Sequence, residues 1–210
     1  MVMRKDRVNM VLDLLEEEYP EAECALHHKN PFELLVAVAL SAQTTDVSVN
    51  KVTPALFEKY PTPQALASAD EKDVIQIIKT IGMYKTKSKN IINMSKMLVS
   101  DYGGKVPESD EELVKLPGVG RKTANVVMSV AFGHQRIAVD THVFRVSNRI
   151  GIVDEPDVLK TELALMKRIP QNRWSKTHHS LIFHGRLCCT ARNPKCGECV
   201  IKDLCKKNFK

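Results

Sequence analysis

Lys122 and Asp140 are the residues of this chain whose types and spacing best suit a covalent reaction. Lys122 comes just after a glycine turn, Leu-Pro-Gly-Val-Gly at positions 116–120, and Asp140 follows eighteen positions later in Val-Asp-Thr-His. An unprotonated primary amine is a nucleophile, and a carboxylate beside it can stabilise positive charge or assist proton transfer. Together with a turn that can bind phosphate, the pair predicts attack on a sugar carbon of DNA.

The turn itself has the composition of an anion site. Gly118 and Gly120 can adopt positive φ and let a ligand approach the backbone closely, so the turn can direct its amide N–H groups at one phosphate. The helix expected over Arg121 to Phe132 begins there, and the positive end of its dipole adds to the attraction. The alternative is a helical connection that binds nothing.

Both candidate catalytic residues also have plainer interpretations. Lys122 would lie in the first turn of that helix, where the macrodipole disfavours a cation and favours a neutral amine, but many lysines in such a place are merely solvated. Asp140 before Thr-His-Val-Phe is typical of a helix N-cap. Capping and catalysis are compatible, because a carboxylate fixed at a helix start is already positioned.

Four cysteines close to the C-terminus have the spacing of a metal or cluster site. Six, two and five residues separate them in order, and only one pair forms a Cys-x-x-Cys knuckle, which favours a [4Fe-4S] cluster over structural zinc. Cys188 makes the first ligand ambiguous on spacing alone, and Cys24 is expected to be a buried small hydrophobe. The candidate ligands are Cys189, Cys196, Cys199 and Cys205.

Basic residues surround these cysteines. Seven lysines and arginines from Arg186 to Lys210 stand against only Glu198 and Asp203. This excess predicts a loop that the cluster scaffolds and that presses against phosphates. The alternative is a solvated basic tail around an electron carrier.

The segments that must position these residues are all predicted to be helices. Apolar residues recur at helical spacing nearly throughout, and no alternating strand pattern with a hairpin turn occurs, so the sequence predicts an all-α fold. Asn30-Pro31 opens one helix, Gly103-Gly104 ends another, and further helices are expected over Asp157 to Ile169 and Trp174 to Leu187. The segment 78–84 faintly echoes 114–120, which indicates either a glycine-terminated helix or a second tight turn facing the same groove.

Length and charge set the class of protein. The chain has 210 residues and a formal net charge of +6, which favours polyanionic partners because each basic side chain at a phosphate displaces a counterion. The longest apolar run, Leu34 to Leu40, is too short to span a bilayer, and the N-terminus lacks the apolar stretch of a secretion signal. We therefore expect an intracellular protein, which would lie in the cytoplasm or nucleoid if its source is a bacterium or an archaeon.

With these motifs together, the chain resembles the endonuclease III family of the helix-hairpin-helix superfamily. The members of that family are bifunctional DNA glycosylases and abasic-site lyases of base excision repair. The resemblance covers nearly the whole chain. The resemblance rests on six motifs: Ser41-Ala-Gln-Thr-Thr-Asp46, Ile81-Gly-Met-Tyr84, Leu116 to Asn125, Val139-Asp-Thr-His142, His184-Gly-Arg186 and the four cysteines.

The resemblance implies two helical lobes with a DNA-binding cleft between them. A six-helix barrel with the helix-hairpin-helix would span 24–134, and an iron–sulfur lobe would combine 1–23 with 135–210. The expected enzyme acts on double-stranded DNA that carries oxidised pyrimidines or abasic sites. We expect it to be a monomer with no membrane partner. The family's spacing places the first cluster ligand at Cys189 and leaves Cys188 outside.

The resemblance also implies roles for single residues. Lys122 would be the nucleophile and Asp140 its essential carboxylate. Gln43 would fill the gap left by the extruded nucleotide, and Met83 would wedge into the opposite strand, where the family commonly has leucine. Further DNA contacts are expected from Gly118, Gly120, Arg121, His142, Arg186, Arg192 and Lys195.

Three other functions fit parts of the pattern. A monofunctional mismatch glycosylase shares the hairpin, the aspartate and the cluster, but the resemblance implies that it lacks the lysine at 122. A non-catalytic iron–sulfur DNA-binding protein would not cleave abasic sites. A small ferredoxin-like carrier fits poorly with the long helical framework that precedes the cysteines.

Overall fold

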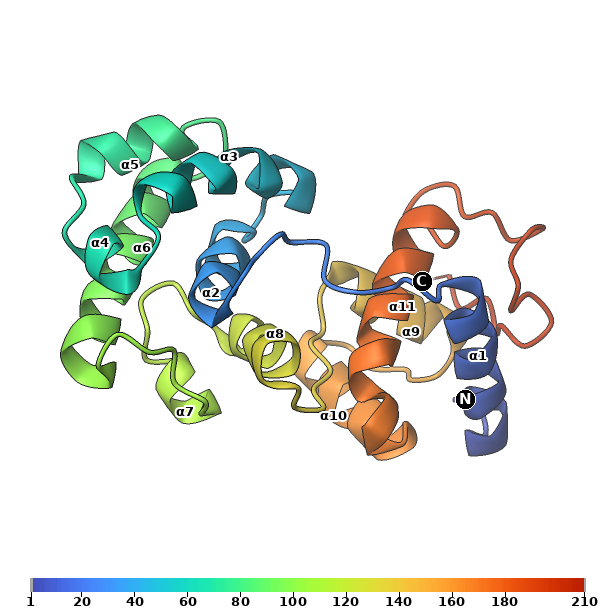
Figure 1. Cartoon of the computed structure of the whole chain (residues 1–210). Coiled ribbons are helices and arrows are strands. Elements are labelled where there is room, and N and C mark those ends of the chain that lie inside the picture. Colours follow the sequence, from blue (N-terminus) through green and yellow to red (C-terminus); the bar gives the residue numbers. More distant parts are fainter. Residues whose placement is uncertain (1, 210) are drawn as a thin grey trace. The chain divides into compact units, whose positions relative to one another are not determined.

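The computed structural model describes residues 2–209, and its regular elements are all helices (Figure 1). No strand occurs within these residues, so the all-α prediction is confirmed. None of the helices described is both long and apolar enough to cross a membrane. The elements are α1 (Lys5–Glu18), α2 (Pro31–Leu40), α3 (Asp46–Lys59), α4 (Pro63–Ala67), α5 (Glu71–Ile78), α6 (Tyr84–Tyr102), α7 (Asp110–Leu113), α8 (Arg121–Phe132), α9 (Thr141–Ile150), α10 (Val158–Arg168), a 3₁₀ turn (Gln171–Arg173) and α11 (Trp174–Leu187).

The helices form two compact units. The central unit comprises Cys24–Gly133 and holds α2 to α8. The other unit joins the described parts of Met1–Glu23 and His134–Lys210, and so holds α1 together with α9, α10 and α11. The first segment of the chain therefore shares a core with the last third of the sequence.

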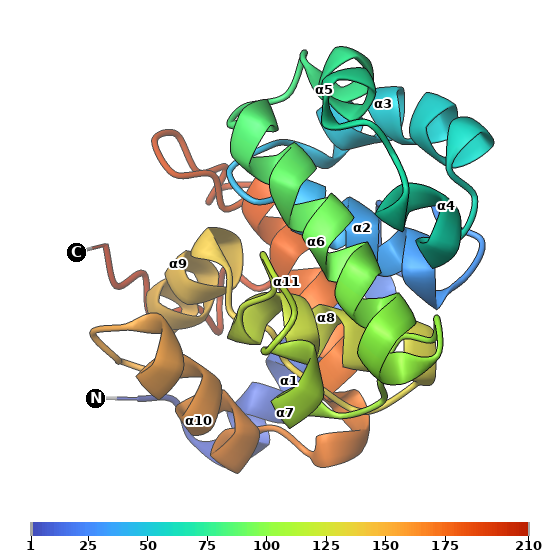
Figure 2. The same cartoon turned by 90° about the vertical axis from the view of Figure 1, so that its left-hand side faces the viewer.

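Helix α2 forms the centre of the unit of residues 24–133. Its sequence from Phe32 to Leu40 is buried on every side, as expected for a helix that is apolar all round. It packs against α3, α6 and α8, and α6 also lies along α4 and α5 (Figure 2). The side chain of Asn30 caps α2 by accepting from the N–H of Glu33 at 2.9 Å, and the carboxylate of Glu33 accepts from the N–H of Lys29 at 2.7 Å.

In the other unit, α11 packs against both α1 and α9. The apolar stripe of α1, which includes Val8 and Leu15, is fully buried in this core. Arg173 fastens the start of α11 to α1 through ion pairs of 2.8 Å with Asp13 and with Glu16. The cysteine segment leaves from the C-terminal end of this packed helix.

Several predicted boundaries agree closely with the structure. Helix α11 runs from Trp174 to Leu187 as expected, and α6 ends at Gly103, which has a φ of +60°. The helix that leads into the glycine turn is only four residues long, and the hydroxyl of Ser109 caps it by accepting from the N–H of Glu112 at 3.4 Å.

Candidate active site and cysteine group

The glycine turn lies between α7 and α8. Gly118 has a φ of +80°, and a Cβ there would lie 3.1 Å from atoms of the Asn90 side chain, so backbone strain and crowding both require glycine. Gly120 has a φ of −103° and is the extended N-cap of α8. Gly118 thus uses the positive φ that glycine permits, whereas Gly120 does not, because an N-cap residue adopts extended backbone.

The start of α8 has the features of an anion site. No side chain caps it, and a Cβ at Gly120 would meet nothing within 4 Å. The first N–H groups of a helix have no partner inside the helix, so here they are available to a ligand that approaches the turn. Arg121 and Lys122 are the first two residues of α8, and both are exposed.

Asp140 belongs to the other unit, where it is the N-cap of α9. Its Oδ1 accepts from the N–H of Val143 at 2.8 Å, which confirms the capping interpretation. The segment before it is fixed as well, because Nδ1 of His178 lies 2.7 Å from the carbonyl oxygen of Ala138. The carboxylate is thus held at a defined place while remaining partly exposed.

His142 is the second residue of α9 and lies beside Arg145. Nη2 of Arg145 is 3.2 Å from Nδ1 of His142 and donates to the carbonyl oxygen of Gly185 at 2.8 Å. Burial lowers the pKa of His142, the nearby guanidinium groups of Arg145 and Arg186 lower it further, and Asp140 opposes the shift. This lowering favours the neutral form of the His142 imidazole.

The cysteine segment follows α11 and wraps back toward α9. Cys189, Cys196, Cys199 and Cys205 are all partly buried reduced thiols. Burial raises the pKa of Cys205, and negative charge on the other three sulfurs raises it further, whereas the N–H of Lys207, 3.3 Å from its Sγ, opposes the rise. Four sulfurs that repel one another's charge in a partly buried loop are a donor set that an iron–sulfur cluster would fit and stabilise.

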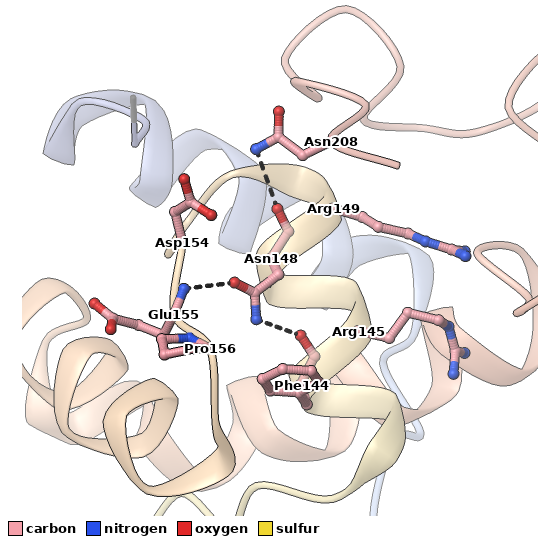
Figure 3. A pocket seen from close by; sticks show the side chains of 8 residues that line it. All are labelled: Phe144, Arg145, Asn148, Arg149, Asp154, Glu155, Pro156 and Asn208. Atoms are coloured by element: carbon pink, nitrogen blue, oxygen red, sulfur yellow. Dashed lines mark hydrogen bonds between the residues drawn. The ribbon is translucent and has the colours of Figure 1, made fainter. Parts of the chain in front are cut away.

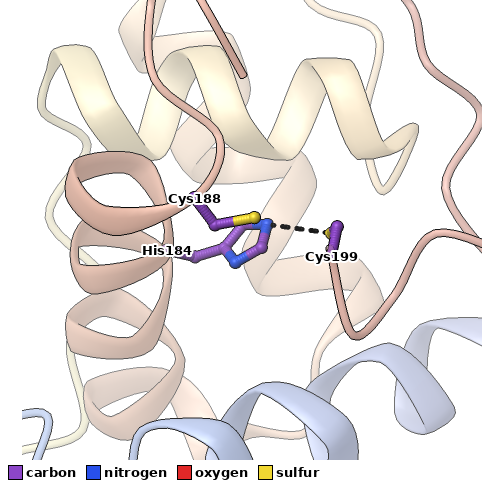
Figure 4. Close-up of side chains that lie close together, drawn as sticks. All are labelled: His184, Cys188 and Cys199. Carbon is purple, nitrogen blue, oxygen red and sulfur yellow. Dashed lines mark hydrogen bonds between the residues drawn. The ribbon is translucent and has the colours of Figure 1, made fainter. Parts of the chain in front are cut away.

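Cys188 lies in the same group of sulfurs. Ligand atoms of His184, Cys188 and Cys199 lie within 4.8 Å of one another, and Nε2 of His184 is 3.7 Å from Sγ of Cys199 (Figure 4). Burial and the neighbouring Cys199 raise the pKa of Cys188 to about 12. Local geometry thus places both Cys188 and Cys189 near the remaining cysteines.

Two arginines of α9 support this segment, and the sequence did not single them out. Arg145 donates through Nε to the carbonyl oxygen of Cys189 at 3.3 Å, while Arg149 donates to those of Thr190 at 2.7 Å and Ala191 at 2.8 Å. Nη1 of Arg149 also lies 3.9 Å from Sγ of Cys189. Their spacing of four residues on one helix face was the available signal.

A cavity of about 610 Å³ borders the same helix (Figure 3). Asn148 organises its wall: its Oδ1 accepts from the N–H of Glu155 at 2.8 Å, and its Nδ2 donates to the carbonyl oxygen of Phe144 at 2.8 Å. Asn208 closes the other side by donating to the carbonyl oxygen of Asn148 at 3.3 Å. None of the residues predicted for DNA contact or cluster ligation lines this cavity.

The expected DNA-contact residues divide between the two units. Gln43, Met83, Gly118, Gly120 and Arg121 belong to the central unit, as does Lys122. His142, Arg186, Arg192 and Lys195 belong to the unit that carries Asp140 and the cysteines. Gln43, Met83 and the three basic residues of the cysteine region are exposed.

Comparison with known proteins covers almost every residue of the chain. The model of HhH-GPD superfamily base excision DNA repair proteins matches residues 36–171, and that of the iron–sulfur binding domain of endonuclease III matches residues 189–205. The chain is 54% identical to endonuclease III of Bacillus subtilis, covering 97% of this chain and 94% of that protein. It is 47% identical to endonuclease III of Escherichia coli K12, covering 97% of each.

This chain belongs to the endonuclease III family. A solved structure described as a trapped endonuclease III–DNA covalent intermediate has the same fold, with a TM-score of 0.93 at 50% identity over 98% of this chain and 97% of that one. A non-covalent endonuclease III–DNA complex matches equally well, with a TM-score of 0.93.

Membership of the endonuclease III family settles the class of activity. The protein is a DNA glycosylase and abasic-site lyase of base excision repair that acts on oxidised pyrimidines. It carries the iron–sulfur binding domain of endonuclease III at its C-terminal end, and the matched segment begins at Cys189 and ends at Cys205. The sequence-based expectations of family, fold class, activity and iron–sulfur cofactor are therefore confirmed.

Proposed function

We propose that Lys122 is the nucleophile of this endonuclease III and that Asp140 is its essential carboxylate. The exposed amine of Lys122 extends from the first turn of α8, beside the uncapped backbone of the glycine turn. A phosphate held by that backbone would bring a neighbouring deoxyribose within reach of the amine. The N-terminal end of the α8 dipole attracts that phosphate as well.

The proposed reaction begins with attack of the Lys122 nitrogen on C1′ of the damaged nucleotide. As the new C–N bond forms, the bond from C1′ to the base breaks, and the base leaves with the bonding electrons and takes up a proton. Opening of the sugar then gives a Schiff base between Lys122 and C1′. Loss of a proton from C2′ and departure of the 3′ phosphate complete the β-elimination.

Asp140 is suited to stabilise the positive charge that develops on the sugar. Its capping bond to Val143 holds the carboxylate in one orientation, so little reorganisation is needed when that charge appears. It is also able to accept a proton from the ammonium form of Lys122, which frees the amine for attack.

The damaged nucleotide must leave the helical stack before Lys122 can reach it. We propose that Gln43 fills the space that it vacates and that Met83 inserts into the opposite strand, in place of the leucine that is common in the family. Methionine is apolar and flexible, so it can still intercalate. A lesion that weakens stacking or pairing lowers the cost of this extrusion.

Backbone contacts hold the DNA in register. We propose that the amides near Gly118 and Gly120 bind phosphate, together with Arg121 of the central unit. His142, Arg186, Arg192 and Lys195 would make the contacts of the other unit. The partner is double-stranded DNA with a damaged pyrimidine or an abasic site, and the enzyme acts as a monomer inside the cell, in the cytoplasm or nucleoid.

The proposed functional division of the chain follows these roles. Residues 24–134 form the helix-hairpin-helix domain, while residues 1–23 and 135–210 form the iron–sulfur domain. Cys189, Cys196, Cys199 and Cys205 are the proposed ligands of a [4Fe-4S] cluster. When bound, the cluster would scaffold the loop and hold its basic residues toward phosphates, and no step of the base excision depends on redox chemistry.

Borohydride trapping tests the nucleophile directly. Reduction of the Schiff base should give a covalent protein–DNA adduct with the native enzyme, and Lys122→Ala should abolish it. Lys115→Ala is the matched control, because Lys115 is an exposed lysine just before the same turn and has no proposed role. An undiminished adduct yield from Lys122→Ala, with the adduct mapped to another residue, would refute the assignment.

A further inference from the structure

Lys87 in α6 is a lysine in an unusual place. Only 5% of its surface is exposed, whereas Lys85 and Lys89 on either side of it are exposed. Lysine is almost never fully buried without a partner, because removing an ammonium ion from water is costly. Burial accordingly lowers the pKa of Lys87.

The partner of Lys87 is Thr44, 43 positions earlier in the sequence. Nζ of Lys87 donates to Oγ1 of Thr44 at 2.6 Å. The backbone N–H of Lys87 makes the ordinary helical hydrogen bond of 3.0 Å to the carbonyl oxygen of Met83, so Lys87 lies one turn after Met83 in α6. The side chain of Lys87 therefore ties the turn between α2 and α3 to the first turn of α6, directly after the turn between α5 and α6.

These two turns lie against each other. A Cβ placed on Gly82 would lie 3.9 Å both from the carbonyl oxygen of Gln43 and from Oγ1 of Thr44. The first turn is itself closed by a hydrogen bond of 3.0 Å from the N–H of Thr44 to the carbonyl oxygen of Ser41. The two segments thus form one continuous surface of the central unit.

Each turn holds a residue in left-handed backbone conformation. Gln43 has a φ of 53° and Met83 a φ of 57°, values that disfavour any residue other than glycine. Such strain persists only where the surroundings enforce it, and it concentrates at functional sites. Both side chains are exposed, with 55% of the surface of Met83 accessible to solvent.

We propose that Lys87 is a positioning residue that clamps these two turns together and so sets the separation of Gln43 and Met83 before DNA binds. This inference rests on the proposed function, in which these two residues enter the duplex. A pair held in its bound arrangement loses less conformational freedom on binding than a mobile pair does. The hydrogen bond between Lys87 and Thr44 supplies the constraint. It holds in place the strained backbone next to it, at Gln43 and Met83.

The clamp should matter most when a stacked base has to be extruded. An abasic site has no base to unstack, so extrusion there is easier and a fixed pair of inserting residues contributes less. Loss of the clamp should therefore slow excision of a damaged base more than cleavage of a ready-made abasic site. A purely structural role for Lys87 would slow both reactions to the same extent.

The test measures single-turnover excision from a duplex with one oxidised pyrimidine, beside cleavage of an abasic duplex of the same sequence. Lys87→Met keeps the volume of the side chain and removes the charge, and Lys89→Met is the exposed control on the same helix. We expect Lys87→Met to slow excision roughly tenfold or more and cleavage of the abasic site much less. A 2-aminopurine next to the lesion should show a smaller fluorescence rise, which reports less unstacking.

A double-mutant cycle separates the clamp from the insertion role. In a Gln43→Ala/Met83→Ala background, Lys87→Met should cause little further loss, because residues that act through one another are not additive. If Lys87→Met slows excision in that background by the same factor as in the native protein, the clamp proposal is wrong, while the insertion of Gln43 and Met83 is unaffected. Wild-type excision by the Gln43→Ala/Met83→Ala protein would overturn the insertion role, and the clamp with it.

The hydroxyl partner offers a second route to the same result. Thr44→Val is isosteric but cannot accept a hydrogen bond, whereas Thr44→Ser retains the acceptor. If Thr44→Val excises slowly and Thr44→Ser excises at the native rate, the clamp is supported even if Lys87→Met fails to fold. Equal rates for the two Thr44 variants would contradict it.

Discussion

The hydroxyl of Tyr19 lies 3.1 Å from Nδ1 of His184, although the two residues are 165 positions apart in sequence. Tyr19 stands just after α1, and His184 lies in α11, with its other ring nitrogen 3.7 Å from Sγ of Cys199. Burial raises the pKa of Tyr19 well above its usual range, and the nearby cysteine sulfurs add to this rise. One buried contact therefore connects the beginning of the chain to the cysteine group.

Removing this hydroxyl should destabilise the protein modestly. Tyr19→Phe leaves Nδ1 of His184 without its partner in a buried site, at an expected cost of about 1 kcal/mol. For a chain of this size, that cost corresponds to a fall of roughly 2–4 °C in the midpoint of thermal unfolding of the cluster-loaded protein. Tyr102→Phe serves as control. Equal midpoints for Tyr19→Phe and the native protein would show that the contact contributes nothing.

Asp140 should have two separable roles, in capping and in catalysis. Asparagine caps helices about as well as aspartate, so Asp140→Asn should unfold at nearly the native temperature while excising at least about a hundredfold more slowly. Asp140→Ala should lose the activity and also about 1 kcal/mol of stability. Excision rates and thermal midpoints of both variants check this.

Asp157 provides a matched control for the cap. Its Oδ1 accepts from the N–H of Lys160 at 2.8 Å at the start of α10, and it has no proposed catalytic role. Asp157→Asn and Asp157→Ala should reproduce the stability pattern with native excision rates. Native activity in Asp140→Asn would contradict the role of its carboxylate.

The cysteine variants should separate ligands from bystanders. Cys196→Ser is expected to lose bound iron and visible absorbance, because thiolates are the ligands of such clusters. Cys188→Ser and Cys24→Ser should retain both. Iron per chain and the absorption spectrum are the measurements. Loss of iron from Cys188→Ser alone would move the first ligand from Cys189 to Cys188.

Stability should fall in mild acid partly because of His179. Burial lowers the pKa of His179 to about 4, Lys176 lowers it further, and Glu23 opposes the shift. Since the unfolded chain binds the proton more readily, with a pKa near 6.5, the contribution is present above that pH and is lost as the pH falls toward 4. The full loss from this group is on the order of 3 kcal/mol.

Chemical unfolding at roughly pH 7 and pH 4.5 tests this contribution. His179→Gln should lose less stability between these pH values than the native protein does. The pKa of His184 is also lowered to about 4 by burial, so part of the acid sensitivity should remain in the variant. The same loss in both proteins would remove His179 as a cause.

The sequence by itself determined the local elements and their chemistry. Caps such as Asn30 and Asp140, the terminating Gly103 and the bounds of α11 were predictable, because each depends on hydrogen bonds or backbone angles within a few residues. The amine after the glycine turn and the spacing of the cysteines were visible for the same reason. Which of the two glycines uses positive φ was not determined by residue type, because the φ of Gly120 depends on its place as an N-cap.

Only the tertiary structure decided which distant side chains meet. The contacts of Lys87 with Thr44, Tyr19 with His184, and Arg149 with the carbonyl of Thr190 join residues from about 40 to 165 positions apart. No local pattern encodes such pairs, since helix packing selects them when each unit buries its apolar faces. Burial in that packing also shifts the pKa values of Lys87 and His179, which sequence position alone does not determine.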